Sequence, residues 1–149
     1  PFTVICDYAH TDDGLKNVLS SLRPFVKGRF IVLFGCAGER DSAKRILMAH
    51  AVADYADYVF LTSDNPRGEN PQSIIDSVSG YFDEKKVPYT AEVDRRKAIN
   101  SALNMLQYND TLILCGKGHE DYQVLNGITV YLDEHDIVKK FMDNYNKEN

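Results

Sequence analysis

The sequence predicts an α/β fold in which an open, mostly parallel sheet has helices on both of its faces. Short apolar runs alternate along the chain with longer segments in which apolar residues recur every three or four positions. This alternation is typical of β–α–β units. Two of the runs, at 31–34 and 112–114, are apolar throughout, as expected of strands buried on both faces. We therefore expect a Rossmann-like sheet of six strands, one of them antiparallel.

The individual elements are expected in a regular order. Strands at 3–7, 30–34, 58–62, 88–92, 111–115 and 129–132 alternate with helices at 12–23, 42–56, 71–79, 94–107 and 133–145. The first and fourth helices are supported by apolar residues at helical spacing, namely Leu15, Val18, Leu19 and Leu22, and Ile99, Leu103 and Leu106. Near the end, Asn126-Gly127 lies between two short apolar runs, which predicts a tight hairpin and hence the antiparallel strand.

Length and composition are those of one globular domain with a full hydrophobic core. The chain has 149 residues, of which 44% are hydrophobic and 26% charged. Its net charge of −5 argues against nucleic acid as the main partner. No apolar run approaches the roughly 20 residues needed to span a bilayer. Three widely spaced cysteines without a C-x-x-C pair predict reduced thiols, a cytoplasmic location and no metal site.

Polar segments follow five of the expected strands directly. They are 7–10, 35–40, 64–67, 94–95 and 116–120. Because ligands bind outside the carboxyl ends of strands in open α/β sheets, we expect these segments to form one binding edge. The glycines in two of them allow the backbone to approach a ligand. Neither has the spacing of a Walker A phosphate-binding loop.

The segment Asp64-Asn65-Pro66-Arg67 suggests what kind of ligand this edge binds. Pro66 keeps the loop extended and stiff, and Asp64 and Arg67 place opposite charges three residues apart. Such a loop suits a ligand with both ammonium and carboxylate groups, and a guanidinium can bind a carboxylate through two parallel hydrogen bonds. The alternative is a helix N-terminus with a surface ion pair between Asp64 and Arg67.

Four motifs in a fixed order resemble the C-terminal domain of the Mur ligases, above all the members that add diaminopimelate. The chain has DYAHTDD at 7–13, FGCAGERD at 34–41, DNPR at 64–67 and GKGHE at 116–120. The family shows DYAHTPD, FGCGGDRD, DNPR and GKGHE. The differences are Asp12, Ala37 and Glu39, and none removes a charge. The resemblance extends from about residue 4 to residue 133.

The resemblance implies that residues 1–149 form the last of three domains of an ATP-dependent ligase of peptidoglycan biosynthesis. The start of the sequence at Pro1 is then a cut within a longer chain. Such ligases join meso-diaminopimelate to UDP-N-acetylmuramoyl-L-alanyl-D-glutamate through an amide bond. The phosphate-binding loop and the main Mg²⁺ ligands belong to the central domain, so we expect the isolated chain to be inactive and to contribute one side of the ATP site.

The resemblance also implies roles for single residues. Diaminopimelate would be bound by Arg40, Asp64, Asn65, Arg67, Gly116 and Glu120. The Glu120 carboxylate and the Gly116 carbonyl would hold its distal ammonium. ATP would be bound by Asp7, Tyr8 and His10, with Asp7 on the ribose. Lys44 and Arg45 either approach phosphate or lie on a solvated helix face. Asp94, Arg95 and Arg96 are expected to be helix-capping and surface charges.

Three other functions stay open from the sequence. The chain could be a free-standing module that binds an amino acid or a nucleotide. It could belong to a related ligase that acts on folate or on another Mur substrate, although such a ligase should lack DNPR. It could also be a hydrolase that uses Cys36 or Cys115 with His10 or His119, but no nucleophile motif supports this.

Overall fold

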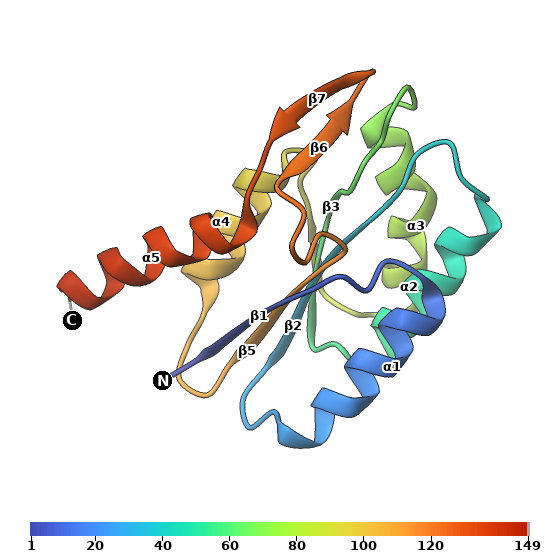
Figure 1. The fold of residues 1–149 in the computed structure, drawn as a ribbon. Helices are drawn as coiled ribbons and strands as arrows, with labels where there is room; N and C mark the ends of the chain where they lie inside the picture. Colours follow the sequence, from blue (N-terminus) through green and yellow to red (C-terminus); the bar gives the residue numbers. More distant parts are fainter. Residues whose placement is uncertain (149) are drawn as a thin grey trace.

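The computed structural model describes residues 1–148, and it confirms the α/β architecture. Five strands form a parallel sheet in the order β1-β5-β2-β3-β4 (Figure 1). Their bounds are Thr3–Asp7 for β1, Phe30–Cys36 for β2, Tyr58–Ser63 for β3, Tyr89–Ala91 for β4 and Thr111–Cys115 for β5. A separate antiparallel pair consists of β6 (Tyr122–Leu125) and β7 (Ile128–Tyr131).

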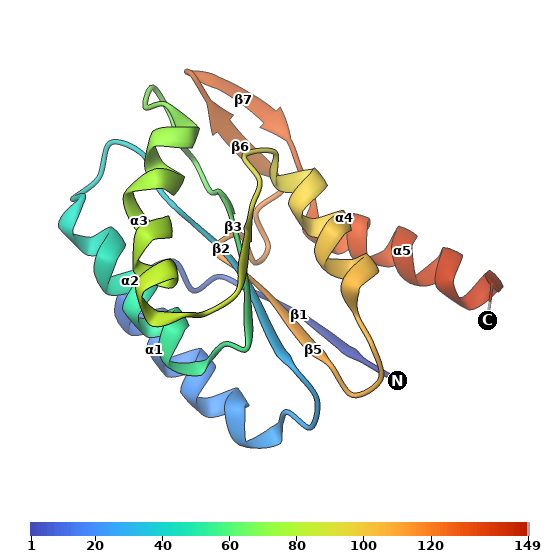
Figure 2. The same cartoon turned by 180° about the vertical axis from the view of Figure 1, so that it is seen from behind.

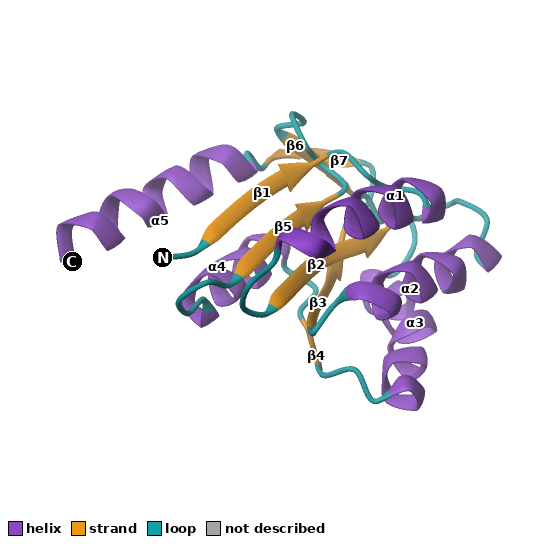
Figure 3. Cartoon of the chain, turned by 90° about the horizontal axis from the view of Figure 1, so that it is seen from below, coloured by secondary structure: helices purple, strands orange, loops and turns teal. Residues whose placement is uncertain are grey.

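Helices cover both faces of the parallel sheet (Figures 2 and 3). One face packs against α1 (Asp12–Leu22), α2 (Ala43–Tyr55) and α3 (Pro71–Lys85), and the other against α4 (Arg95–Met105) and α5 (Glu134–Glu148). A short 3₁₀ helix, Arg23–Phe25, follows α1. Helix α3 continues beyond the predicted end because Phe82, which is fully buried, prolongs its apolar face.

The two layers of core follow from the alternation of side chains along the strands. In β2, Phe30, Val32 and Phe34 pack with the first group of helices, whereas Ile31 and Leu33 pack with the second. All seven residues of β2 are buried. A central strand therefore needs the continuous apolar run that the sequence provides. None of the helices in residues 1–148 has the length and apolar character needed to cross a membrane.

The strand count of the main sheet differs from the prediction. The segment expected as a sixth, antiparallel strand of that sheet pairs with β6 instead, in a hairpin that turns at Asn126 and Gly127. Both turn residues have positive φ, 49° and 76°, as the predicted two-residue turn requires. Three of the four residues of β7 are exposed. Ile128 and Tyr131 are 64% and 63% exposed, so β7 lies outside the core of the main sheet.

Strands β2 and β5 separate at the carboxyl edge of the sheet. Strand β5 pairs with β2 only as far as Leu114 opposite Leu33. Strand β2 remains paired with β3 to the last residues of both, Cys36 and Ser63. The chain leaves β2 toward α2 on one face, whereas it leaves β5 toward the hairpin and α5 on the other (Figure 1). Diverging connections of this kind mark the ligand-binding position in open α/β sheets.

Candidate functional site

Lys117 joins the loops that follow β3 and β5. Its side chain is fully buried, and its Nζ lies 2.6 Å from Oδ1 of Asn65 and 3.1 Å from Oδ1 of Asp64. Burial lowers the pKa of Lys117, while the Asp64 carboxylate favours the charged form. The predicted segments 64–67 and 116–120 therefore do meet at one edge. The charge of Lys117 is used within the fold.

The hairpin holds segment 64–67 from the other side. The Gln123 side chain, 4% exposed, donates a hydrogen bond from Nε2 to the carbonyl of Asp64 at 2.7 Å. The Val124 amide donates to Oδ1 of Asn65 at 3.0 Å and its carbonyl accepts from the Arg67 amide at 3.1 Å. The Asn126 amide donates to the Arg67 carbonyl at 2.6 Å. The hairpin thus fixes the backbone on both sides of Arg67.

Arg67 is partly fixed by its own loop and by the loop after β2. Its Nη1 donates to the carbonyls of Gly38 at 3.1 Å and of Asn65 at 3.4 Å. Within residues 1–148, Nε and Nη2 form no hydrogen bond, so one edge of the half-buried guanidinium is free for an anion. Its φ of 55° lies in the left-handed region, which side chains rarely occupy. The alternative considered above, a surface ion pair between Asp64 and Arg67, is contradicted, because Asp64 is paired with Lys117 instead.

Gly38 explains how the loop after β2 comes so close to segment 64–67. Its amide donates to the Asn65 carbonyl at 2.8 Å. A Cβ at this position would lie only 1.9 Å from the Pro66 carbonyl oxygen. No other residue type fits without moving the backbone. Gly38 of FGCAGERD is therefore needed for the close contact between the loops that follow β2 and β3.

The prediction that Arg95 is a surface charge is wrong. Arg95 is 1% exposed, and its guanidinium donates to three acceptors: Oε2 of Glu134 and the carbonyls of Ser63 and Cys115, at 2.8, 2.9 and 2.9 Å. Ser63 and Cys115 are the last residues of β3 and β5. Arg95 therefore ties together the two strand ends from which the ligand loops emerge. The neighbouring predictions are confirmed, since Asp94 caps α4 by accepting from the Lys97 amide and Arg96 is exposed.

Arg45 does not lie on a solvated helix face. It is 6% exposed and binds the carboxylate of Glu69 through two hydrogen bonds of 2.8 and 2.9 Å. The same carboxylate accepts from the Glu39 amide at 3.0 Å. The side chain of Glu39 in turn accepts from the Gly68 amide at 3.2 Å. This network joins the loops after β2 and β3, whereas Lys44 is exposed and lies 3.9 Å from Asp12.

The residues predicted to bind ATP lie at the end of β1. Tyr8 is 45% exposed, and its ring contacts those of His10 and His119, with centroids 4.7 and 5.5 Å away. One carboxylate oxygen of Asp7 accepts from the Ala9 amide at 2.9 Å. Gly118, with φ of 53°, allows the loop after β5 to pass Tyr8, because a Cβ there would lie 2.9 Å from the Tyr8 Cβ. The three aromatic rings form an exposed surface suited to stacking with a planar base.

Glu120 and Gly116 lie on the loop that Lys117 anchors. The Glu120 amide donates to the Lys117 carbonyl at 2.8 Å, and its carboxylate accepts from the Tyr122 hydroxyl at 2.9 Å. This carboxylate raises the pKa of Tyr122. Gly116 has a φ of 116° and donates to the Asp7 carbonyl at 3.0 Å. Glu120 therefore provides a half-exposed acceptor that a ligand ammonium could share.

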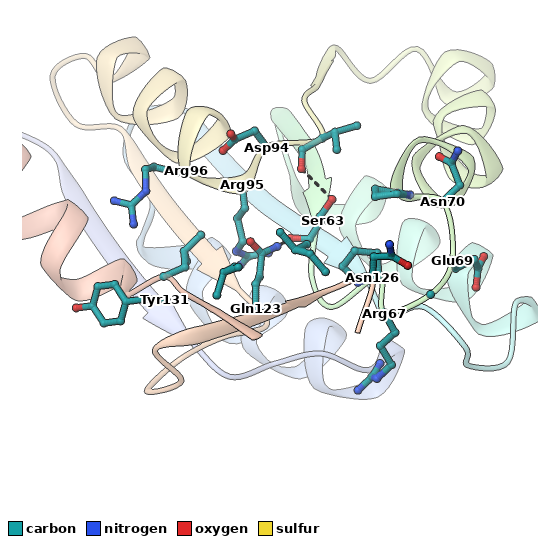
Figure 4. A pocket seen from close by; sticks show the side chains of 17 residues that line it. Ser63, Arg67, Glu69, Asn70, Asp94, Arg95, Arg96, Gln123, Asn126 and Tyr131 are labelled. Atoms are coloured by element: carbon teal, nitrogen blue, oxygen red, sulfur yellow. Dashed lines mark hydrogen bonds between the residues drawn. The ribbon is translucent and has the colours of Figure 1, made fainter. Parts of the chain in front are cut away.

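Two cavities border the edge. The first, about 320 Å³, is lined by His10, Arg40, Lys44 and Arg45 among others, and Arg67 does not contribute to it. The second, about 650 Å³, lies between the start of α4, segment 66–71 and the hairpin (Figure 4). In that view the Arg67 side chain extends away from the other labelled residues. Arg40 is thus grouped with His10 rather than with the other residues predicted to bind diaminopimelate.

The three cysteines are free thiols, and burial raises their pKa values. The pKa is about 11 for Cys6 and about 12 for Cys36. Such thiols are protonated at neutral pH and are poor nucleophiles. The hydrolase alternative therefore has no activated cysteine to support it. Within residues 1–148, no group of three or more potential ligands could hold a metal ion.

The family follows from a comparison with known proteins. Residues 1–118 match the family described as "Mur ligase, glutamate ligase domain". The chain belongs to the Mur ligases. A UDP-N-acetylmuramoyl-L-alanyl-D-glutamate–2,6-diaminopimelate ligase of Prochlorococcus marinus subsp. pastoris is 44% identical over 144 residues, or 97% of this Mur ligase chain. A ligase of the same name from Caldanaerobacter subterraneus subsp. tengcongensis is 45% identical over 141 residues, or 95%.

A solved structure supports the same relationship. A ligase with this name superposes on the Mur ligase chain with a TM-score of 0.90 and 38% identity, over 96% of the chain. The chain spans only 28% and 29% of the two curated relatives and 29% of the solved structure. The Mur ligase chain is therefore similar to one part of these longer proteins.

Proposed function

We propose that this Mur ligase domain is the amino-acid-binding C-terminal domain of a three-domain, ATP-dependent ligase that adds meso-diaminopimelate to UDP-N-acetylmuramoyl-L-alanyl-D-glutamate. The observation that carries the proposal is that segments 64–67 and 116–120 meet around Lys117. Arg67 is the last residue of the first segment and Glu120 the last residue of the second. A cationic and an anionic side chain on one edge complement an amino acid with both charges. Because both other substrates are nucleotides, we propose a cytoplasmic enzyme.

In this proposal the side chains of the edge bind and orient diaminopimelate. The free edge of the Arg67 guanidinium binds a carboxylate, with the Asn65 side chain of the same loop beside it. Glu120 and the Gly116 carbonyl accept hydrogen bonds from the distal ammonium, which leaves the other amine to react. Asp64 takes part indirectly, since its carboxylate is paired with Lys117. Fixing one end of the substrate in this way favours reaction at the other.

ATP would supply the phosphoryl group that activates the substrate carboxylate. The exposed rings of Tyr8 and His10 suit contact with an adenine, and the carboxylate oxygen of Asp7 that does not bind Ala9 suits a ribose hydroxyl. Because residues 1–148 hold no cluster of metal ligands, we propose that Mg²⁺ is bound mainly by the central domain. The role of this domain is then to close over the central domain and exclude water.

Two assays test the proposal. In the first, the full-length ligase receives both nucleotide substrates, Mg²⁺, and meso-diaminopimelate and L-lysine at equal concentration. Incorporation of diaminopimelate should exceed that of lysine by about 100-fold, because lysine leaves Arg67 without its anion. Comparable incorporation would contradict the assignment of Arg67.

The second assay separates a ligase domain from a free-standing enzyme. The 149-residue chain contains no Walker A spacing, so the purified chain should release no phosphate from ATP. Amide formation by the chain alone would overturn the three-domain proposal. Tight binding of an amino acid to the chain, with no ligase activity in the full-length protein, would favour the binding-module alternative.

A further inference from the structure

We propose that Lys117 is a positioning residue that turns the Asn65 amide so that its NH₂ group faces the ligand. The proposal rests on the proposed function for the identity of the ligand, an amino acid with a second carboxylate. It assigns a role to the lysine of GKGHE that does not involve contact with the substrate. Lys117 is 0% exposed, so its ammonium is unable to reach an anion outside the fold.

The orientation of the Asn65 amide follows from its two neighbours. Nζ of Lys117, 2.6 Å away, and the Val124 amide, 3.0 Å away, approach the same side-chain atom. An ammonium and a backbone N–H can only donate hydrogen bonds. The atom that faces both must therefore be the carbonyl oxygen, and the NH₂ group must point away from them. No residue among 1–148 accepts a hydrogen bond from that NH₂ group.

With this orientation, segment 64–67 offers a ligand hydrogen-bond donors but no free anionic group. Asp64, the anionic residue of segment 64–67, is neutralised by Lys117 at 3.1 Å. The donors that the segment leaves without an acceptor among residues 1–148 are then the NH₂ group of Asn65, a residue that is 8% exposed, and the free edge of the Arg67 guanidinium. Two donors on one stiff loop select a carboxylate and disfavour an ammonium. Lys117 thereby helps to set the polarity with which the substrate binds.

A double-mutant cycle tests whether Lys117 acts through Asn65. In the full-length ligase, Lys117→Met and Asn65→Ala should each raise the KM for diaminopimelate by about tenfold or more, with little change in the KM for ATP. The KM of the double variant for diaminopimelate should exceed that of Asn65→Ala by no more than about twofold. If the KM of the double variant instead rose by the product of the two single increases, the proposal would be overturned. Lys97→Met, an exposed lysine on α4, is the matched control.

A second variant keeps the proposal testable if Lys117→Met fails to fold. Asn65→Asp retains an oxygen for Lys117 and Val124 but replaces the outward NH₂ group by an anionic oxygen. It should therefore fold, with a melting temperature close to that of the wild type, yet use diaminopimelate at least about tenfold less well. Unchanged use of diaminopimelate by this variant would show that the amide does not donate to the ligand.

The orientation itself can be measured without any ligase activity. In the isotope-labelled chain, a scalar coupling through the hydrogen bond should connect the Val124 amide nitrogen with the side-chain carbonyl carbon of Asn65. Absence of this coupling in the wild-type chain would overturn the assigned orientation of the Asn65 amide. A full-length enzyme that does not use diaminopimelate would instead refute the proposed function. The coupling would still show how the Asn65 amide is oriented.

Discussion

Arg95 and Glu134 form an ion pair that is completely shielded from solvent. Nε of Arg95 lies 2.8 Å from Oε2 of Glu134, and neither side chain has any exposed surface. The pair links the first residues of α4 and α5. The same guanidinium binds the carbonyls at the ends of β3 and β5. The second Glu134 oxygen is buried without a hydrogen-bond partner among residues 1–148, so Arg95 is its essential counter-ion.

Arg95→Met should destabilise the chain by about 3–5 kcal/mol, because it leaves the Glu134 carboxylate buried and unpaired. Chemical denaturation followed by circular dichroism measures this change. The double variant Arg95→Met/Glu134→Leu should recover much of the loss, since no buried charge remains. Arg96→Met, at the exposed neighbouring position, should change stability by less than about 0.5 kcal/mol. A small effect of Arg95→Met would contradict a clamping role.

Glu69 should make stability depend on pH in the acid range. Its hydrogen bonds with Arg45 lower its pKa from 4.5 to about 2. A carboxyl group with a lowered folded-state pKa stabilises the fold above its ordinary pKa, and this contribution disappears as the pH falls toward the lowered value. The melting-temperature gap between wild type and Glu69→Gln should therefore be full at pH 6 and shrink between about pH 4.5 and pH 2. A gap that is constant with pH would exclude this ion pair as its source.

The buried thiols should resist chemical modification in the folded chain. Cys36 and Cys115 are 3% and 1% exposed, and burial raises the pKa of both. With Ellman's reagent at pH 8, they should react only after denaturant is added, whereas the half-buried Cys6 should react slowly. Mass spectrometry of the labelled peptides identifies each site. Rapid labelling of Cys36 at neutral pH would make the hydrolase alternative credible again.

Replacement of Arg67 should affect one substrate of the full-length ligase selectively. Arg67→Ala should weaken the use of diaminopimelate by about 2–5 kcal/mol, the usual effect of removing one partner of a desolvated charge pair. Arg67→Lys should recover only part of this, because an ammonium is unable to bind a carboxylate through two parallel hydrogen bonds. Steady-state kinetics with each substrate varied in turn measures the effect. Equal losses for ATP and diaminopimelate would indicate a general loss of folding, and Arg96→Ala serves as the control.

The sequence predicted the strands well because their burial is visible in composition alone. Residues 31–34 and 112–114 are apolar without interruption and form the centre of the sheet. The final strand was misplaced, although the turn at Asn126-Gly127 was correctly predicted. A turn sequence defines the local pairing of two strands, but whether the pair joins the main sheet depends on tertiary contacts. The exposed residues of β7 agree with its position outside the main sheet.

The site was predicted less completely, because charged residues were expected to be at the surface. A signal for Arg95 was available, since Ala98, Ile99 and Ala102 follow it at the spacing of one helical face, and all are buried. Met48, Ala49 and Val52 follow Arg45 in the same way. An arginine in register with an apolar face is therefore a candidate for a buried ion pair. No such pattern precedes Lys117, whose burial depends on contacts with segment 64–67 and the hairpin.

The backbone pairing between Arg67 and the hairpin has a consequence for protein engineering. The position of the guanidinium depends on main-chain hydrogen bonds with Val124 and Asn126, almost sixty residues further along the chain. Transplanting the four residues 64–67 into another domain of this fold would carry over the side chains without the scaffold that orients them. The unit that can be exchanged between enzymes is the loop together with residues 122–131. Chimeras that alter substrate choice should keep both pieces from one parent.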